Sequence, residues 1–355
     1  MATLNRQLDA LIAKQRPQLQ RAFRLAIRNI VSDVTLNQVT MSLRRNDIEA
    51  AIDALGVSRA AFSPFVQSLT NTYAQAGTIA AASNVWITPQ GRAKVRFDLA
   101  NPLANEFITG YSSNLVTNIA DDTRDALRVA IRAGYEQGRG PLDIARDLTG
   151  RIGANGRRTG GIVGLNEPQA RAVQNMRQRL DSGDPVEMRK VLNMTRRDKR
   201  FDGKIKRAIE SGTKLSQADI NRLTGRYSDR LLALRGETIA RTETAAAVEN
   251  ARYDAFKMGM DENNVPDWAV EKTWLHGGGN KDPRDDHAAF SGTKVMGLNT
   301  PFVLPDGTRM QGPHDTSLGA GAKHVVNCTC RARNEVRWDL IYERETQGAA
   351  ALELV

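Results

Sequence analysis

A run of evenly spaced apolar residues leads into the part of the chain that holds its most reactive side chains. Apolar residues recur every seven positions at Leu232, Ile239, Ala246 and Tyr253. This spacing predicts one amphipathic helix from about Ser228 to Met258, and Gly259 is suited to its C-terminus. All four histidines and both cysteines of the chain follow this helix. The helix therefore leads into the region where metal binding, proton transfer or nucleophilic attack is chemically available.

Beyond Gly259 the pattern changes from helical spacing to short strands and turns. Four runs have the length and composition of strands: Val270–Leu275, Thr293–Met296, Phe302–Leu304 and Thr308–Gln311. Pro305-Asp306-Gly307 is a turn signal between the last two runs. We therefore predict that the region from Leu231 to Arg333 forms a small, loop-rich module entered by one helix.

The rest of the chain is predicted to be mainly helical. Its 355 residues are 41% hydrophobic but only 5% aromatic, and this composition suits helices better than sheets. Helical spacing begins at residues 3–33, where Pro17 either kinks the helix or starts a second one, and continues to residues 142–149. A β-hairpin is predicted near residues 85–97. The expected fold class is mainly α with a small C-terminal α+β module, and a helical N-terminal region with one β-hairpin.

Changes in composition divide the chain into five predicted parts. These are a helical N-terminal region with the hairpin, a Gly/Arg-rich connector, a basic helical segment, the α+β module and a C-terminal tail: residues 1–150, 151–166, 167–230, 231–340 and 341–355. The glycine-rich connector could cradle a phosphate, but it lacks the Gly-Lys-Ser/Thr ending of a nucleotide-binding loop. The preferred interpretation is a mobile connector at a domain boundary.

Two features bear on the compartment in which the chain works. No apolar run approaches the roughly 18 residues of a membrane-spanning helix, and the N-terminus carries Asp9 and lacks the apolar core of a signal peptide. Cys328 and Cys330 are separated by one residue, which makes a poor disulfide framework. We therefore expect no membrane span and a reducing environment.

The positive charge of the chain is concentrated in its middle. The formal net charge is +10, and the stretch from Arg171 to Arg235 alone holds 17 Lys or Arg against 8 Asp or Glu, a difference of 17 − 8 = +9. Such a segment favours a polyanion such as nucleic acid, although charge runs are also common on solvated helix faces. Aromatic residues for base stacking are nearly absent, so phosphate contacts are expected. The candidate DNA-binding residues are Arg196, Arg197, Lys199, Arg200, Lys204, Lys206 and Arg207.

The histidines and cysteines of the module are candidate zinc ligands. Cys328, Cys330 and His287, together with His314 or His324, supply enough nitrogen and sulfur donors for zinc. The signal is weak, because zinc knuckles usually separate their cysteines by two or four residues. We therefore expect no cofactor, and a bound zinc ion is the less favoured alternative.

A catalytic interpretation and a structural interpretation compete for the same module. Asp282, Asp285 and Asp286 lie beside His287, and carboxylates next to a histidine can bind a divalent ion or activate water. The alternative function is therefore a metal-dependent nuclease or toxin-like enzyme that uses His287 and the Cys328/Cys330 pair. We prefer a structural role without catalytic residues, in which an arginine such as Arg284 or Arg331 clamps carbonyls and carboxylates through its planar fork.

Three motifs occur in order across the module. Ile239-Ala240-Arg241-Thr242-Glu243 lies on the predicted long helix, Trp274 is followed by Asp282-x-Arg284-x-x-His287, and Asn327-Cys328-Thr329-Cys330-Arg331 closes the module. In this order and spacing they resemble the phage head morphogenesis family, the Mu F-like minor head proteins. Asp285 and Thr329 stand where that family often has arginine. Gly138-x-Gly140-Pro141-x-x-Ile144-Ala145 resembles the helical segment that commonly precedes the module.

The resemblance implies a non-enzymatic minor capsid protein that acts in phage virion assembly. Its expected partners are the portal protein, capsid or scaffolding proteins, and packaged double-stranded DNA bound non-specifically, with a role in DNA ejection. The expected location is the capsid interior, and the host cytoplasm during assembly. The N-terminal helices (Thr3 to Ala82) lie outside the motifs, and we hypothesise that they dock on portal or capsid protein. The motif residues expected to have structural roles are Arg241, Glu243, Trp274, Asp282, Arg284, His287, Cys328, Cys330 and Arg331.

Overall fold

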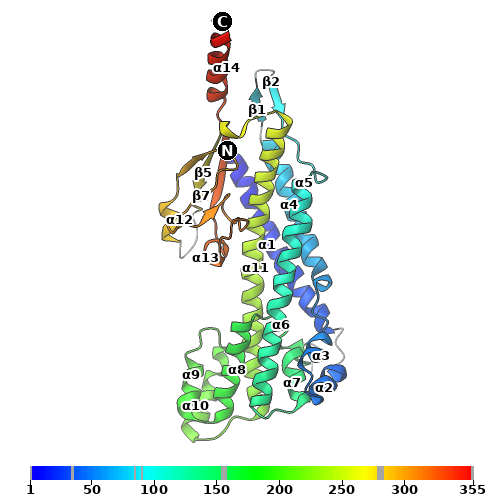
Figure 1. Ribbon diagram of the computed structural model, residues 1–355. Helices are drawn as coiled ribbons and strands as arrows, with labels where there is room; N and C mark the ends of the chain where they lie inside the picture. The colour runs from blue at the N-terminus through cyan, green and yellow to red at the C-terminus, as the bar shows by residue number, and fades with distance from the viewer. Residues whose placement is uncertain are drawn as a thin grey trace. The chain divides into compact units, whose positions relative to one another are not determined.

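The protein is mainly α-helical with a small C-terminal α+β module, as predicted (Figure 1). The computed structural model describes residues 2–32, 36–83, 85–88, 91–152, 158–277 and 284–352. The α-helices are α1 (Ala2–Ser32), α2 (Leu36–Arg44), α3 (Ile48–Asp53), α4 (Ser63–Ser83), α5 (Pro102–Asn105), α6 (Ser112–Glu136), α7 (Pro141–Thr149), α8 (Glu167–Ser182), α9 (Pro185–Leu192), α10 (Asp202–Ser211), α11 (Gln217–Glu262), α12 (Asp285–Ala289), α13 (Ala322–Val325) and α14 (Trp338–Leu352).

The strands form small antiparallel sheets. They are β1 (Val85–Thr88), β2 (Gly91–Lys94), β3 (Arg151–Ile152), β4 (Arg158–Thr159), β5 (Val270–Leu275), β6 (Lys294–Met296), β7 (Phe302–Val303), β8 (Arg309–Met310) and β9 (Arg331–Val336). Strands β1 and β2 pair as the predicted hairpin, and β5 is the central strand of the three-stranded sheet β6-β5-β9. Strand β9 was missing from the sequence-based prediction because its alternating charged residues, Arg331 to Glu335, carry no apolar strand pattern.

Local sequence signals explain where several helices begin and end. Helix α8 begins after Asn166, whose side chain accepts a hydrogen bond from the Gln169 amide, while the Gln169 side chain accepts one from the Asn166 amide. It ends at Gly183, which has a left-handed conformation. Pro141 occupies the first turn of α7, where its missing N–H costs no hydrogen bond. Helix α1 continues through Pro17, so Pro17 does not start a second helix.

Two predicted helix ends in the second half of the chain were wrong. A helix was expected to begin near Ser228 and to end at Gly259, but α11 begins at Gln217, is continuous through Gly225 and does not stop at Gly259. Both glycines permit close packing instead of ending the helix. The backbone of Gly160 packs against Gly225, and a Cβ atom on Gly259 would lie 2.6 Å from the Val95 side chain.

The folded chain is divided into two compact units. Unit 1 comprises residues 1–20, 67–112 and 238–355, and unit 2 comprises residues 21–66 and 113–237. This division differs from the predicted one, because the N-terminal region 1–150 contributes to both units and residues 151–166 lie inside unit 2. Such a division depends on which helices pack together across long stretches of sequence.

The predicted connector is packed within unit 2 where the structure describes it. In residues 158–166, the side chains of Ile162, Val163 and Leu165 are buried. The Gly160 amide donates a hydrogen bond of 2.8 Å to the Asp229 carboxylate. Residues 158–166 are therefore anchored in unit 2 and do not mark a boundary between the units. Residues 153–157 lie outside the described part of the chain.

Two apolar clusters support the module in unit 1. One joins the hairpin to α11 and the sheet, with Trp86 packed edge-to-face against Phe256. The other is centred on Trp274 of β5, which is fully buried and packs against Phe302. The predicted tail after residue 340 is part of α14, a helix that was not predicted from the sequence. Among the residues that the structure describes, no helix is both long and apolar enough to cross a membrane.

Candidate functional site

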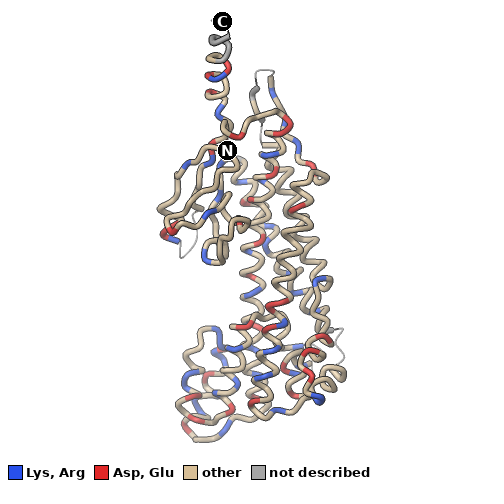
Figure 2. The backbone as a smooth tube through the Cα atoms, viewed as in Figure 1, with Lys and Arg blue, Asp and Glu red and all other residues tan. Residues whose placement is uncertain are grey.

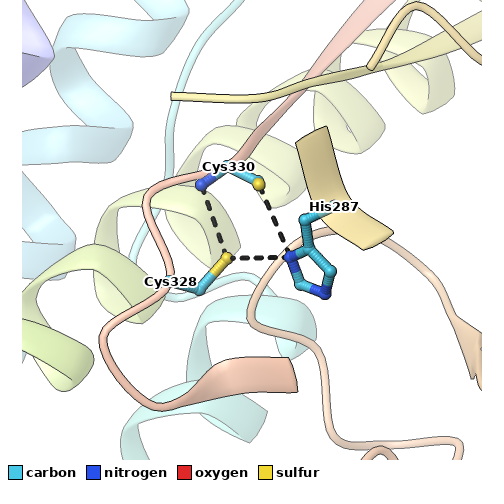
Figure 3. Close-up of side chains that lie close together, drawn as sticks. All are labelled: His287, Cys328 and Cys330. Carbon is cyan, nitrogen blue, oxygen red and sulfur yellow. Dashed lines mark hydrogen bonds between the residues drawn. The ribbon is translucent and has the colours of Figure 1, made fainter. Parts of the chain in front are cut away.

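The clearest cluster of reactive side chains joins α12 to the segment just before β9. His287 lies on α12, and Cys328 and Cys330 lie between α13 and β9 (Figure 3). The three residues are 1%, 2% and 2% exposed, so they are almost completely shielded from solvent. Both cysteines are free thiols. The folded chain therefore brings His287 together with two further zinc-ligand candidates that are 41 and 43 residues away in sequence.

The three side chains point toward one another. His287 Nδ1 lies 3.6 Å from Cys328 Sγ and 3.6 Å from Cys330 Sγ. The backbone amide of Cys330 donates a hydrogen bond of 3.4 Å to Cys328 Sγ, and Figure 3 shows all three interactions. The imidazole nitrogen and the two sulfurs all lie within 4.8 Å of one another. This is a compact set of one nitrogen and two sulfur donors.

A second histidine continues the cluster on the far side of the His287 ring. His287 Nε2 lies 3.1 Å from His324 Nδ1, and His324 Nε2 lies 3.0 Å from Asp306 Oδ2. The Thr308 hydroxyl is 3.2 Å from the same His324 nitrogen. The side chains therefore form a chain from the Asp306 carboxylate through two imidazoles to the sulfurs. Asp306 was expected only as a turn residue, and its turn position gave no sign of this contact.

The hydrogen-bond chain indicates which ring nitrogens carry protons. A carboxylate accepts hydrogen bonds, so His324 Nε2 must be the donor to Asp306. In a neutral ring, His324 Nδ1 is then an acceptor, and His287 Nε2 must donate to it. This leaves the lone pair of His287 Nδ1 directed at the two sulfurs. Such a lone pair can accept a thiol proton or bind a metal ion.

The two thiols differ in their readiness to ionise. The pKa of Cys330 is lowered, chiefly by a hydrogen bond from Cys328. The pKa of Cys328 is raised, first by the same interaction with Cys330 and then by burial. The pair therefore accepts one negative charge readily, whereas a second charge is opposed unless a cation is present.

His314 lies beside this cluster. It is 2% exposed, and neither of its ring nitrogens has a hydrogen-bond partner among the residues that the structure describes. The ring is near enough to the Cys330 backbone and to His287 for both to affect its charge. Burial lowers the pKa of His314 to about 4, so the ring is neutral at pH 7. Its nitrogens are therefore available as ligands.

The backbone around the cysteines is held by the clamps that the sequence predicted. Arg284 donates from Nε to the Lys323 carbonyl and from Nη2 to the Val326 carbonyl. Arg331 donates to the Asp9 carboxylate and to the Asn5 carbonyl. The prediction that these arginines clamp carbonyls and carboxylates is confirmed. The clamps fix the segment that carries the two thiols.

Gly277 is a site residue that sequence reasoning missed. The Thr329 hydroxyl, between the two cysteines, donates a hydrogen bond of 2.8 Å to the Gly277 carbonyl. A Cβ atom on Gly277 would lie only 2.0 Å from the Thr329 carbonyl oxygen, so a side chain cannot fit there. The run of three glycines after Leu275 and His276 was the available signal.

The remaining motif residues lie on α11 and β5. Glu243 on α11 accepts a hydrogen bond of 2.6 Å from Tyr111, and Arg241 is two residues before it. Trp274 of β5 packs edge-to-face against His287, with 5.3 Å between ring centroids. Asp282 lies outside the described residues, so its predicted part in the motif has no structural counterpart here. The described members of the motif have buried or bonded structural positions.

The basic segment contains both paired and unpaired cations. Three of the seven candidate DNA-binding residues form ion pairs, Arg197 with Asp202, Arg200 with Asp198 and Lys204 with Asp219. The other four candidates have no ion pair with a described acid, and all are exposed: Arg196, Lys199, Lys206 and Arg207. Figure 2 shows basic and acidic residues interspersed over α8, α9 and α10. Local pairing therefore reduces the set of cations available to a polyanion.

Unpaired cations extend beyond the predicted set. Within Arg171 to Arg235, four more exposed cations have no ion pair with an acid in the described chain: Arg189, Lys214, Arg222 and Arg226. Arg207 and Lys214 line an open hollow of about 670 Å³ between the end of α10 and the start of α11. Sequence reasoning missed these residues because it followed the densest charge run, whereas pairing depends on the fold.

Comparisons of the chain with protein-family models, with curated proteins and with solved structures found no match in any of the three.

Proposed function

We propose that this protein is a minor capsid protein that acts in phage virion assembly and contacts packaged DNA through phosphates. The main supporting observation is the set of eight exposed cations on unit 2 that form no ion pair with an acid in the described chain. An unpaired surface cation can exchange its counterions for a phosphate without first breaking an ion pair. The ordered motifs of the module, which resemble those of Mu F-like minor head proteins, support the assembly role.

A scaffold is favoured over an enzyme by the burial of the reactive cluster. His287, Cys328 and Cys330 are at most 2% exposed, whereas a catalytic metal site keeps a position open to water or substrate. A nuclease that uses these three residues needs access that the described structure does not provide. A plasmid-nicking assay with added divalent metal ions tests this alternative, and cleavage that disappears in a His287→Ala variant would support it.

Non-specific DNA binding by the exposed cations is expected to be strongly salt-dependent. Four phosphate contacts imply that log K falls with log salt at a slope of about −4, or about a 100-fold loss of affinity between 50 and 200 mM salt. Replacing Arg196, Lys199, Lys206 and Arg207 together by alanine is expected to reduce this slope by about 3 to 4. Fluorescence anisotropy with a labelled duplex at several salt concentrations measures the effect.

The matched control removes the same charge elsewhere. Exposed basic residues on α1 supply it: Arg6, Lys14, Arg16 and Arg21, all changed to alanine. The control is expected to keep most of the salt dependence, because long-range charge contributes less than direct phosphate contact. Equal losses in both variants, or a wild-type affinity that does not change with salt, would contradict a local DNA contact.

The proposed role in assembly can be tested by identifying the proteins that bind the chain. The N-terminal helices within residues 3–82 are proposed to dock on portal or capsid protein. Co-purification of the full chain with portal protein before DNA packaging supports this proposal. Recovery of the full chain only as a free protein, with portal complexes that lack it, argues against a portal-associated role.

A further inference from the structure

We propose that His287, Cys328, Cys330 and His314 bind one zinc ion that cross-links the C-terminal module. The ion would connect α12, the segment before β9 and the loop after β8, and would add to the small apolar cluster and the Arg284 hydrogen bonds there. All four side chains are at most 2% exposed. A closed site of this type stabilises a fold and performs no chemistry. The site does not depend on the proposed capsid role.

The distances from His287 to the two cysteine sulfurs match those around a tetrahedral zinc ion. Zinc binds sulfur at about 2.3 Å and imidazole nitrogen at about 2.0–2.1 Å, so a tetrahedral angle places nitrogen and sulfur about 3.6 Å apart. The two distances from His287 Nδ1 to the cysteine sulfurs are both 3.6 Å. An ion at the centre of this group therefore needs little movement of these side chains.

The surroundings of His287 prepare it to bind a cation. Metal-bound histidines usually donate their second ring N–H to an acceptor, which fixes the tautomer and orients the ring. Here His287 Nε2 has His324 Nδ1 as its acceptor at 3.1 Å, and His324 is held in turn by Asp306 at 3.0 Å. The unprotonated Nδ1 then faces the sulfurs. His324 and Asp306 are positioning residues and are not ligands.

The backbone also favours a thiolate at Cys328. The Cys330 amide donates a hydrogen bond of 3.4 Å to Cys328 Sγ. Backbone N–H groups that point at sulfur stabilise negative charge there. Soft thiolates combined with imidazole favour zinc over magnesium or calcium, which prefer oxygen ligands.

His314 is assigned as the fourth ligand because a metal ion would supply the partner that its buried ring lacks among the described residues. A buried imidazole without hydrogen bonds costs about 1–3 kcal/mol, and native proteins rarely leave such a group unpartnered. His314 lies next to the Cys330 backbone but outside the compact group of three donors, so its ring must shift to complete the tetrahedron. Its left-handed backbone, with φ of 69°, places strain at the same residue.

A purely apolar role for the cysteines explains fewer of these features. Thiols that donate to His287 account for the two sulfur distances, and a buried pair of thiols is common in protein cores. They leave both nitrogens of His314 without a partner in the described part of the module. They also give no reason for the hydrogen-bond chain from Asp306 through His324 to His287. This chain requires two buried histidines and sets which ring nitrogen of His287 carries the proton.

The first test measures metal in the full-length wild-type chain. Protein produced with zinc in the medium is expected to contain one zinc per chain, and substitution with Co²⁺ should give the absorption of a tetrahedral site with thiolate ligands. Removal of the metal with a chelator is expected to lower the melting temperature by about 5–10 °C and to be reversed by zinc. Metal-free protein with unchanged melting behaviour in the presence of zinc overturns the proposal.

Single variants identify the ligands and the positioning residues. Cys328→Ser, Cys330→Ser and His287→Ala are expected to lose stoichiometric zinc, whereas His324→Ala and Asp306→Asn should bind it about 10- to 100-fold more weakly. His276→Ala is the matched control, because His276 lies in the same module outside the donor group, and it should bind normally. Circular dichroism confirms that each variant retains its helices.

His314→Ala tests the fourth ligand separately. The variant is expected to lose at least about 100-fold in zinc affinity and to change the Co²⁺ spectrum. Unchanged affinity and spectrum would remove His314 from the site. A disulfide between Cys328 and Cys330, detected as the loss of both thiols in freshly purified protein, would also overturn the zinc assignment.

Discussion

Replacing Asp147 by alanine is expected to lower the free energy of unfolding by about 3–5 kcal/mol. This carboxylate in unit 2 is bonded by three guanidinium groups, from Arg139, Arg151 and Arg177. The side chains of Asp147 and Arg177 are only 7% and 5% exposed. Without the carboxylate, three like charges remain close together with little access to water. Urea unfolding monitored by circular dichroism measures the loss.

The arginine pKa values show why the loss should be large. The pKa of Arg177 is lowered to about 10, first by burial and then by repulsion from Arg151. The pKa of Arg139 is lowered to about 10, first by burial and then by repulsion from Arg177 and Arg151. These residues therefore already carry the cost of burying charge, which the directly bonded Asp147 offsets together with the nearby charges of Asp143 and Asp181.

A neighbouring aspartate supplies the control for Asp147. Asp143 is on the same helix, α7, but its side chain is 55% exposed and its ion pairs are longer, 3.7 Å to Arg151 and 4.0 Å to Arg146. Asp143→Ala is expected to cost at most about 1 kcal/mol. Adding Arg177→Met to Asp147→Ala should recover part of the lost stability, because one uncompensated charge is removed. Equal costs for Asp143→Ala and Asp147→Ala would contradict this account.

Replacing Glu243 by glutamine is expected to stabilise the protein at pH 8 by about 3 kcal/mol and to have almost no effect at pH 4. Glu243 is 9% exposed, and burial raises its pKa to about 7, against the opposing effect of the hydrogen bond from Tyr111. The difference from its ordinary value of 4.5 is about 2.5 pKa units, at about 1.4 kcal/mol each. Glutamine resembles the protonated acid and remains neutral at every pH.

The direction of the pH effect follows from the raised pKa. The folded state binds a proton on Glu243 more tightly than the unfolded state does, so its contribution to stability is fully present below about pH 4.5. That contribution is lost as the pH rises through about 7. Urea unfolding of both proteins between pH 4 and 8 should therefore show curves that meet at low pH and separate as the pH rises.

Two other acids show how much of the pH dependence of stability belongs to Glu243. Asp254 also has its pKa raised by burial, to about 6, so Glu243→Gln should keep a smaller residual pH dependence. Glu262→Gln, at the exposed end of the same helix, should leave the curve unchanged. A Glu243→Gln variant whose effect is equal at pH 4 and pH 8 would show that proton binding is not its cause.

The described structure shows where sequence patterns were sufficient and where they were not. The hairpin at Val85–Lys94 was predicted because its two strands and turn are adjacent in sequence. Strand β9 was missed for two reasons. Its partner β5 is some 60 residues away, and along β9 charged residues alternate with uncharged ones. The end predicted at Gly259 was wrong because a glycine can end a helix or permit close packing, and only its neighbours decide between the two.

The arrangement of the candidate site could be predicted from the sequence even less well than the fold. The residue types of a zinc site were visible in the sequence, but Cys-x-Cys with distant histidines is compatible with a disordered loop, a core or a ligand set. The approach of His287 Nδ1 to both sulfurs and the His324–Asp306 contact exist only after residues 287, 306, 324 and 330 have been brought together. The roles of Asp306 and Gly277 were therefore beyond local analysis.

The sequence by itself determined the fold class, the module that carries the reactive residues and the excess of positive charge in the middle of the chain. Helical periodicity, turn residues and charge are local properties, so they can be read without knowledge of distant neighbours. The tertiary structure decided which cations are paired, which acids are buried and which donors meet. Ion pairing, desolvation and coordination act over a few ångströms in space, and residues that are distant along the chain come within that range only on folding.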